Sequence, residues 1–199
     1  WCRYQDYYED GWHGTWRMDG GVLAQQAIHH LDALHFLGGP IDRVCAVGTA
    51  LVNRLEAEDT AAAVVVFESG AVGTIVATTA ARDCDFEASI QLVGEKARVK
   101  VGGSALNRLE DWFCVEQDPL ETDVALRHSQ DVPSSYGLGH GPLIRDVLDA
   151  IEAGGPPPVD VESAMTSLRL MHALYASMET GRWIDLRDAP ASTRLGRAR

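Results

Sequence analysis

The stretch TAAAVVVFESGAVGTIVATT, residues 60–79, decides the fold of this chain. Its two apolar, β-branched segments, 60–68 and 71–79, flank a Ser69-Gly70 turn, which is the pattern of a β-hairpin. Apolar residues occupy both faces of the first segment, so the sheet that contains it needs cover on both sides. We therefore expect this sheet to take part in self-association.

Further strand patterns lie on either side of the hairpin. Four more segments are rich in apolar and β-branched residues: 43–52, 87–93, 97–101 and 109–117. No helical pattern separates successive strands of this block, which favours an antiparallel or mixed sheet over a doubly wound parallel one. We predict an α+β fold with helices packed on one face of an open, predominantly antiparallel sheet.

Helical patterns precede and follow the strands. Three helices are predicted, over about 19–37, 142–154 and 160–181, with glycines at their ends. The last helix carries an apolar stripe, made of Ala164, Leu168, Met171, Tyr175 and Met178. The polar residues 118–141 between strands and helices are expected to form a long loop.

Composition indicates an ordinary globular protein. With 199 residues, 46% of them hydrophobic, the chain can bury a core without disulfides or metals. A formal net charge of −12 argues against nucleic acid or an anionic membrane as partner, since both need a basic surface. The four cysteines form no CxxC pair and no apolar run could span a membrane, so we expect a cytoplasmic protein. We predict one domain over residues 1–189 and a flexible tail over 190–199.

The segment GTWRMDGGVLAQQAIHHLDAL, residues 14–34, gathers groups that could do chemistry. On one helix, Gln25, His29 and Asp32 would share a stripe because they lie four and three residues apart. His29 can accept or donate a proton near neutral pH, and Asp32 could orient its ring. Gln25 can hydrogen-bond a hydroxyl but cannot transfer a proton. From the residues alone, a histidine packed into the core stays open as the alternative.

This segment, with the arm before it, resembles the signature of the glucose–fructose oxidoreductase / inositol dehydrogenase (Gfo/Idh/MocA) family. There, an aromatic arm leads into a glycine turn and then a helix with an Asp or Asn and, four residues later, a His. His29 falls on the catalytic histidine position and Gln25 on the Asp/Asn position. The other matches are Tyr7-Tyr8, Trp12–Trp16, Asp19–Gly21, Gly38–Pro40, 58–79, 93–101, 139–151 and 178–186.

The resemblance implies an NAD(P)-dependent oxidoreductase acting on a hydroxyl of a sugar, nucleotide sugar or cyclitol. In that family an N-terminal Rossmann domain binds NAD or NADP, and a C-terminal α/β domain lines the substrate site and forms the oligomer interface. All matches belong to the second domain, and the chain begins with Trp1 rather than Met. We therefore expect the Rossmann domain and the family's catalytic lysine to be absent from this chain, which alone would be inactive. In the intact protein, His29 would exchange the hydroxyl proton.

Six residues complete the predicted site as substrate contacts: Trp12, His13, Trp16, Asp19, Gln26 and His140. The residues leave alternatives open, because Asp19 could instead cap the helix and the aromatic side chains could form an ordinary cluster. His140 could be an exposed loop histidine. Gln25 in place of Asp or Asn favours positioning over proton relay, and His13 stands where arginine is common in the family.

We predict no metal site, and a homodimer or homotetramer formed through the open sheet. The rival interpretation is a non-catalytic domain that binds carbohydrate or only assembles. In that interpretation, Gln25 marks the loss of dehydrogenase activity.

Overall fold

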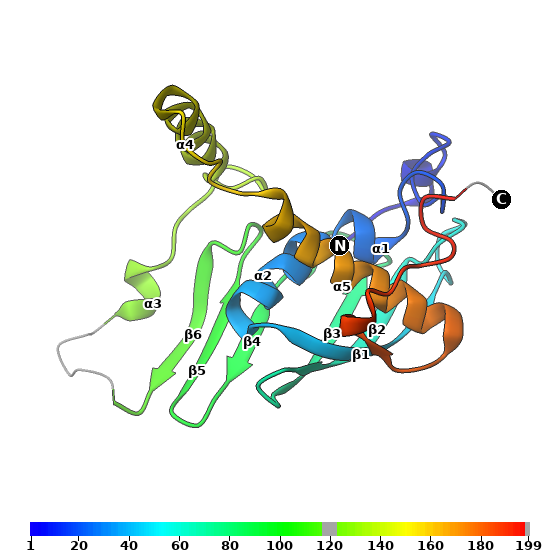
Figure 1. Ribbon diagram of the computed structural model, residues 1–199, viewed down its shortest axis with the longest axis horizontal. Coiled ribbons are helices and arrows are strands. Elements are labelled where there is room, and N and C mark those ends of the chain that lie inside the picture. Colours follow the sequence, from blue (N-terminus) through cyan, green and yellow to red (C-terminus); the bar gives the residue numbers. More distant parts are fainter. Residues whose placement is uncertain (117–122, 198–199) are drawn as a thin grey trace. The chain divides into compact units, whose positions relative to one another are not determined.

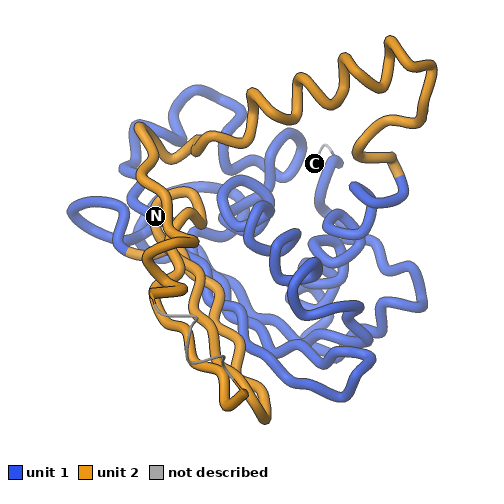
Figure 2. The backbone as a smooth tube through the Cα atoms, turned by 90° about the vertical axis from the view of Figure 1, so that its left-hand side faces the viewer, with its two compact units in different colours: residues 1–86, 162–199 blue, residues 87–161 orange. Residues whose placement is uncertain are grey.

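The computed structural model describes residues 1–116 and 123–197 and divides into two compact units (Figure 2). Unit 1 consists of residues 1–86 and 162–199, and unit 2 of residues 87–161. The α-helices are α1 (Val22–Gln25), α2 (Ile28–Gly38), α3 (Val124–Arg127), α4 (His140–Ala153) and α5 (Val161–Thr180). The strands are β1 (Ile41–Thr49), β2 (Thr60–Phe67), β3 (Val72–Thr78), β4 (Ile90–Val93), β5 (Ala97–Gly102), β6 (Arg108–Cys114) and β7 (Ile184–Asp185). None of the described helices is long and apolar enough to cross a membrane.

Unit 1 is built on an antiparallel sheet with strand order β3-β2-β1-β7. The predicted hairpin is confirmed as β2 and β3, which pair Ala62 with Val76 and Val64 with Thr74. Helices α2 and α5 lie across one face of this sheet (Figure 1). The α+β class with antiparallel strands is therefore confirmed.

The core of unit 1 lies between this sheet and its helices. Val44 and Val65 point inward from β1 and β2, and Leu31 and Leu174 meet them from α2 and α5. All four are almost completely shielded from solvent, and burial of each such side chain contributes about 1.5–3 kcal/mol. The helices are thus held on the sheet by apolar packing, which fixes the frame on which the site is built.

Unit 2 contains a second antiparallel sheet, with strand order β4-β5-β6. Its charged side chains pair across neighbouring strands, as Arg98 does with Asp111 and Lys100 with Glu110. Helices α3 and α4 follow the sheet, and Gly154 ends α4 in a left-handed conformation. The strands expected in one sheet thus hydrogen-bond as two sheets.

Two further sequence predictions differ in detail from the structure. The expected loop 118–141 contains α3, while residues 117–122 lie outside the described part of the chain. Helix α5 is confirmed, but Ala164 and Leu168 of its predicted stripe are exposed; the buried residues are Ser167, Leu170, Met171, Ala173, Leu174, Tyr175, Ala176 and Ser177. Within the predicted flexible tail, the Ser192 hydroxyl donates to Glu179. Residues 198 and 199 are not among those described.

Candidate functional site

The glycine turn of the predicted site is fixed by close contacts. Gly20 adopts a φ of +80°, a conformation that glycine tolerates and most residues avoid. Gly21 has an ordinary φ, but a Cβ there would lie 2.2 Å from the backbone oxygen of Glu58. Glycine is needed at 21 because another part of the backbone passes against it.

The helix predicted over 19–37 is broken after one turn. α1 ends at Gln25, and the Ala27 amide donates to the carbonyl of Val22, five residues back. The regular pattern resumes with α2, where Leu31 donates to Ala27. The prediction of one continuous helix is therefore wrong, because a turn closed by a hydrogen bond over five residues separates Gln25 from α2, which contains His29.

His29 lies in the first turn of α2 with its side chain exposed to solvent. The alternative of a histidine packed into the core is thus excluded for this residue. The neighbouring His30 is turned inward instead, with its ring edge-on to Trp1 at 5.2 Å, and burial lowers its pKa. Asp32 accepts a hydrogen bond from the Ser167 hydroxyl of α5, so its bonded partner is not His29.

Gln25 and Asp19 form a pair at the end of the arm. The Gln25 amide donates to Asp19 Oδ2, which also accepts from the Gly14 amide at 2.9 Å. Asp19 does not cap α1, whose N-cap residue is Gly21. Burial raises the pKa of the Asp19 carboxyl. Gln25 therefore ties the first helical turn to the arm that precedes it.

Arg3, which the sequence analysis missed, contacts a residue of the candidate site. Its guanidinium donates to Gln26 Oε1 at 3.2 Å and lies 5.5 Å from the centre of the Tyr7 ring. It also forms an ion pair with Asp85 at 3.3 Å. Burial, followed by the nearby Asp19 carboxylate, raises the pKa of Tyr7. An isolated arginine in an aromatic arm is the only signal that could have pointed to this contact.

His13 is held within the arm by aromatic rings. It stacks on Trp12 at 3.6 Å between ring centres and lies 4.1 Å from Tyr7, while its Nδ1 is 2.6 Å from Asp10 Oδ2. Trp16 contacts Tyr175 edge-on instead. Tyr7, Trp12 and His13 thus form a packed aromatic cluster, whereas Trp16 packs against α5.

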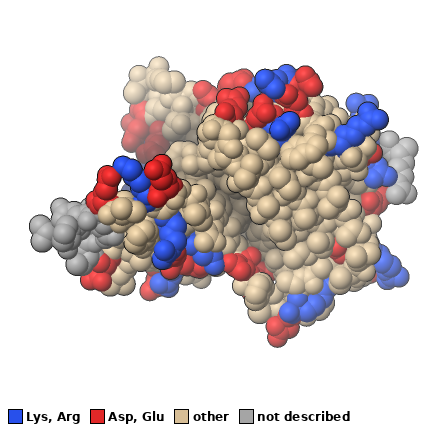
Figure 3. Space-filling model, turned by 90° about the horizontal axis from the view of Figure 1, so that it is seen from below, with Lys and Arg blue, Asp and Glu red and all other residues tan. Residues whose placement is uncertain are grey.

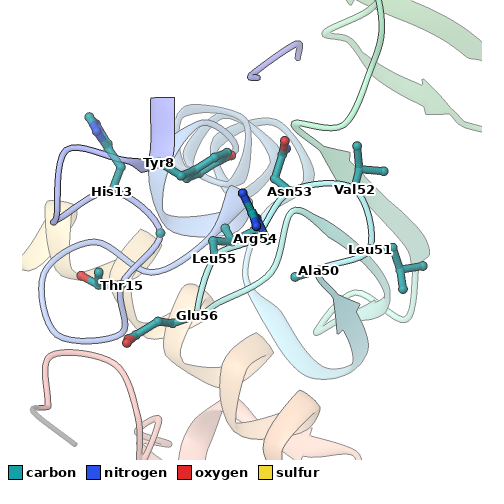
Figure 4. Close-up of a pocket in the computed structure, with 11 residues that line it drawn as sticks. Tyr8, His13, Thr15, Ala50, Leu51, Val52, Asn53, Arg54, Leu55 and Glu56 are labelled. Atoms are coloured by element: carbon teal, nitrogen blue, oxygen red, sulfur yellow. The ribbon is translucent and has the colours of Figure 1, made fainter. Parts of the chain in front are cut away.

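A cavity of about 540 Å³ lies between the arm and the segment of residues 50–56 (Figure 4). Tyr8 and His13 line it from the arm, and Asn53 and Arg54 from the other side. In Figure 4 the His13 ring points away from Asn53 and Arg54. The segment itself is fixed by Asp59, whose carboxylate accepts from three successive backbone amides, those of residues 51–53. Asp59 therefore holds this turn in place before β2 begins.

Glu58, also missed by the sequence analysis, lies beneath the glycine turn with 3% of its surface exposed. Its Oε1 accepts from the Leu23 amide at 3.1 Å and from the Tyr175 hydroxyl at 3.0 Å. Burial raises the pKa of Glu58 to about 7. Glu58, Tyr175 and Trp16 line a second cavity of about 290 Å³.

Most of the predicted residues lie in the arm and the turn of unit 1, whereas His140 belongs to unit 2. That residue begins α4 of unit 2, is exposed, and contacts Tyr136 edge-on at 6.0 Å between ring centres. Within the described ranges, 1–116 and 123–197, no three His, Cys, Asp or Glu side chains gather as a metal site would require.

Residues 1–186 match the family described as "Oxidoreductase family, C-terminal alpha/beta domain". The chain therefore belongs to the Gfo/Idh/MocA oxidoreductase family, and the resemblance seen in its sequence is confirmed. The comparison with curated proteins finds no match.

Solved structures of similar proteins include two WlbA dehydrogenases, both in complex with NADH and UDP-GlcNAcA. The protein from Bordetella pertussis is 36% identical, with a TM-score of 0.85 over 93% of this chain and 54% of its own. The protein from Chromobacterium violaceum is 33% identical, with a TM-score of 0.82 over 93% of this chain and 52% of its own. A levoglucosan dehydrogenase in complex with NADH and levoglucosan shares the fold at 19% identity, with a TM-score of 0.64 over 86% of this chain and 53% of its own. The chain thus spans about half the length of these proteins.

Proposed function

We propose that this chain is the substrate-binding and oligomerisation domain of an NAD(P)-dependent oxidoreductase that acts on a hydroxyl of a nucleotide sugar. The observation that carries the proposal is the exposed imidazole of His29, which follows the glycine turn after helix α1 and the break at its end. The two WlbA dehydrogenases, solved with a nucleotide sugar and NADH, support this substrate class over a free sugar or cyclitol. We propose that the activity belongs to the intact protein, and that this chain alone is inactive.

The proposed chemistry assigns proton transfer to His29. An imidazole can accept the hydroxyl proton near neutral pH when the substrate oxygen lies within hydrogen-bond distance. Gln25 and Gln26 would orient the sugar, since their amides are held by Asp19 and Arg3. Trp12, His13, Trp16, Asp19 and His140 stay our proposed substrate contacts.

The described residues do not provide a dinucleotide-binding fold of their own. Both sheets are antiparallel, whereas the Rossmann fold binds the pyrophosphate at a helix that follows a parallel strand. NAD or NADP would accept or supply the hydride, and we propose that it is held mainly by a part of the protein outside this chain. This chain would supply the wall that binds the sugar and the group that moves the proton.

The test is turnover by the full-length protein with UDP-GlcNAcA and either NAD or NADP. Replacing His29 with Ala should lower kcat by about 10²- to 10⁴-fold, the usual contribution of a general base. His35→Ala, near the end of the same helix, is the matched control and should keep kcat. Unchanged turnover in His29→Ala would remove this residue from the mechanism. Binding of the nucleotide sugar without turnover by the wild type would instead favour the non-catalytic alternative.

We also propose that the protein self-associates through the outer face of the sheet in unit 1. Val47, Val64 and Val76 are exposed on β1, β2 and β3, and β-pairing places them on the face opposite the core. Figure 3 shows a broad surface without Lys, Arg, Asp or Glu, with charged side chains at its rim. Large exposed apolar patches of this kind mark protein interfaces.

Light scattering of the full-length protein tests this interface. Val64→Arg should reduce the molar mass from that of a dimer or tetramer to that of a monomer. Val52→Arg, at an exposed position of the segment 50–56, is the control and should leave the mass unchanged. An unchanged mass for Val64→Arg would place the interface elsewhere.

We propose that the protein is located in a reducing compartment such as the cytoplasm, because all four cysteines are free thiols.

A further inference from the structure

The glycine turn and the first turn of α1 are held from below by Glu58 and Tyr175. The Val22 amide donates to the Glu58 carbonyl at 2.9 Å, and the Leu23 amide donates to Glu58 Oε1 at 3.1 Å. The Tyr175 hydroxyl accepts from the Gly21 amide at 2.9 Å and donates to the same Oε1 at 3.0 Å. The backbone amides of Gly21, Val22 and Leu23 therefore all donate to these two residues. Two of the acceptors are side-chain oxygens, and the third is the Glu58 carbonyl.

These contacts are made out of reach of solvent. Tyr175 is completely buried on α5, and the Oε2 atom of Glu58 is buried with no hydrogen-bond partner in the described structure. The titratable group beside the pair is Asp59, whose carboxylate is engaged with the amides of the 50–56 segment. Both side chains are thus almost completely buried, so loss of one of these bonds would leave a buried polar group without its partner.

The pair also determines where the helix starts and which way it points. α1 has only four residues, too few to be stable through its own hydrogen bonds. It ends at Gln25, and His29 follows after the break. A shift of the Gly21–Leu23 backbone would therefore move both side chains relative to a bound sugar.

We propose that Glu58 and Tyr175 are positioning residues for the proposed reaction, holding the start of α1 so that Gln25 and His29 meet the reacting hydroxyl. The inference rests on the proposed function, and it adds two residues that touch neither substrate nor cofactor. Burial raises the pKa of Glu58 to about 7. Below that pH the carboxyl is mostly protonated and neutral, and the neutral amide of a glutamine resembles it.

The test compares variants of the full-length protein by kcat, KM and the solvent deuterium isotope effect on kcat. Tyr175→Phe removes the hydroxyl that links Gly21 to Glu58, and Tyr4→Phe is the matched control on an exposed tyrosine. Tyr175→Phe should lower kcat by about 100-fold, the cost of a misplacement near 1 Å. Its isotope effect should rise, because proton transfer to His29 becomes slower, while KM stays within about twofold.

Two Glu58 variants separate positioning from folding. Glu58→Gln keeps an oxygen for the Leu23 and Tyr175 donors, so most of the kcat should remain at about pH 6. Glu58→Leu removes that acceptor and should match Tyr175→Phe in both kcat and isotope effect. A purely structural role would lower the active fraction in Glu58→Leu and Tyr175→Phe without moving the isotope effect, and that result overturns the proposal.

The outcomes distinguish this inference from the proposed function. Turnover by the wild type that is lost in His29→Ala supports the proposed function. An unchanged kcat in Tyr175→Phe would then overturn the positioning pair alone. A wild type without any turnover overturns the proposed function, and the role of the pair in that reaction with it.

Discussion

Replacing Glu58 with Gln should change how the stability of the protein depends on pH. In the folded chain, burial raises the pKa of Glu58 from 4.5 to about 7. Between these values the folded state keeps a proton that the unfolded state has released, so the free energy of unfolding falls as pH rises. Each tenfold difference in proton affinity corresponds to about 1.4 kcal/mol, which gives a loss of roughly 3 kcal/mol, complete above pH 7.

Glu58→Gln removes this loss, because the amide carries no charge at any pH. At about pH 4.5 the variant and the wild type should differ little. At about pH 8 the variant should have gained up to roughly 3 kcal/mol relative to the wild type. Glu68→Gln, at an exposed carboxylate in the β2–β3 turn, is the control and should show no such gain.

Urea unfolding followed by tryptophan fluorescence measures this difference. Four of the five tryptophans lie in unit 1, which contains Glu58, so the signal reports mainly on that unit. The comparison needs equal slopes of free energy against urea for both proteins. A difference between variant and wild type that is the same at both pH values would refute the reasoning, since Glu58 would then not keep its proton on folding.

Three further substitutions test the packing of unit 1 by urea unfolding. Gly21→Ala should destabilise by about 1–3 kcal/mol or more because its Cβ would meet Glu58, whereas Gly139→Ala, with open space around it, should not. Leu174→Ala should cost about 2–5 kcal/mol, and equal stability would contradict its place in the core. Asp59→Asn should cost about 1–3 kcal/mol as charge-assisted bonds to three amides weaken.

Much of the sheet could be predicted from sequence because its signal is local. The hairpin at 60–79 follows from β-branched segments around a Ser-Gly turn, and it forms β2 and β3 as expected. Which strands share a sheet is not a local property, and the division into two sheets was missed. The break after Gln25 was missed for a related reason, since the apolar spacing of 19–37 continues through the break unchanged.

In the candidate site, too, the residues recognised from sequence are those in a local pattern, and the residues missed are those joined by long-range contacts. His29 could be selected as a candidate because its position relative to the glycines is a short pattern in the chain. Glu58 could not, because it lies 35 residues from Leu23 and 117 residues from Tyr175, to which it bonds. No spacing rule joins residues so far apart, and a Glu-Asp pair before a strand resembles any strand start.

The need for glycine at position 21 follows from this long-range contact rather than from a special backbone angle. The φ of Gly21 is one that other residues adopt, yet the Glu58 carbonyl and carboxyl leave no room for a Cβ. Those same oxygens accept the amides that start α1. Gly21 and Glu58 therefore act together. The absence of a side chain at Gly21 leaves room for Glu58, and Glu58 orients the start of α1, the helix that precedes His29 in the chain. A larger residue at position 21 and the loss of the Glu58 side chain should thus both displace the backbone at the start of α1.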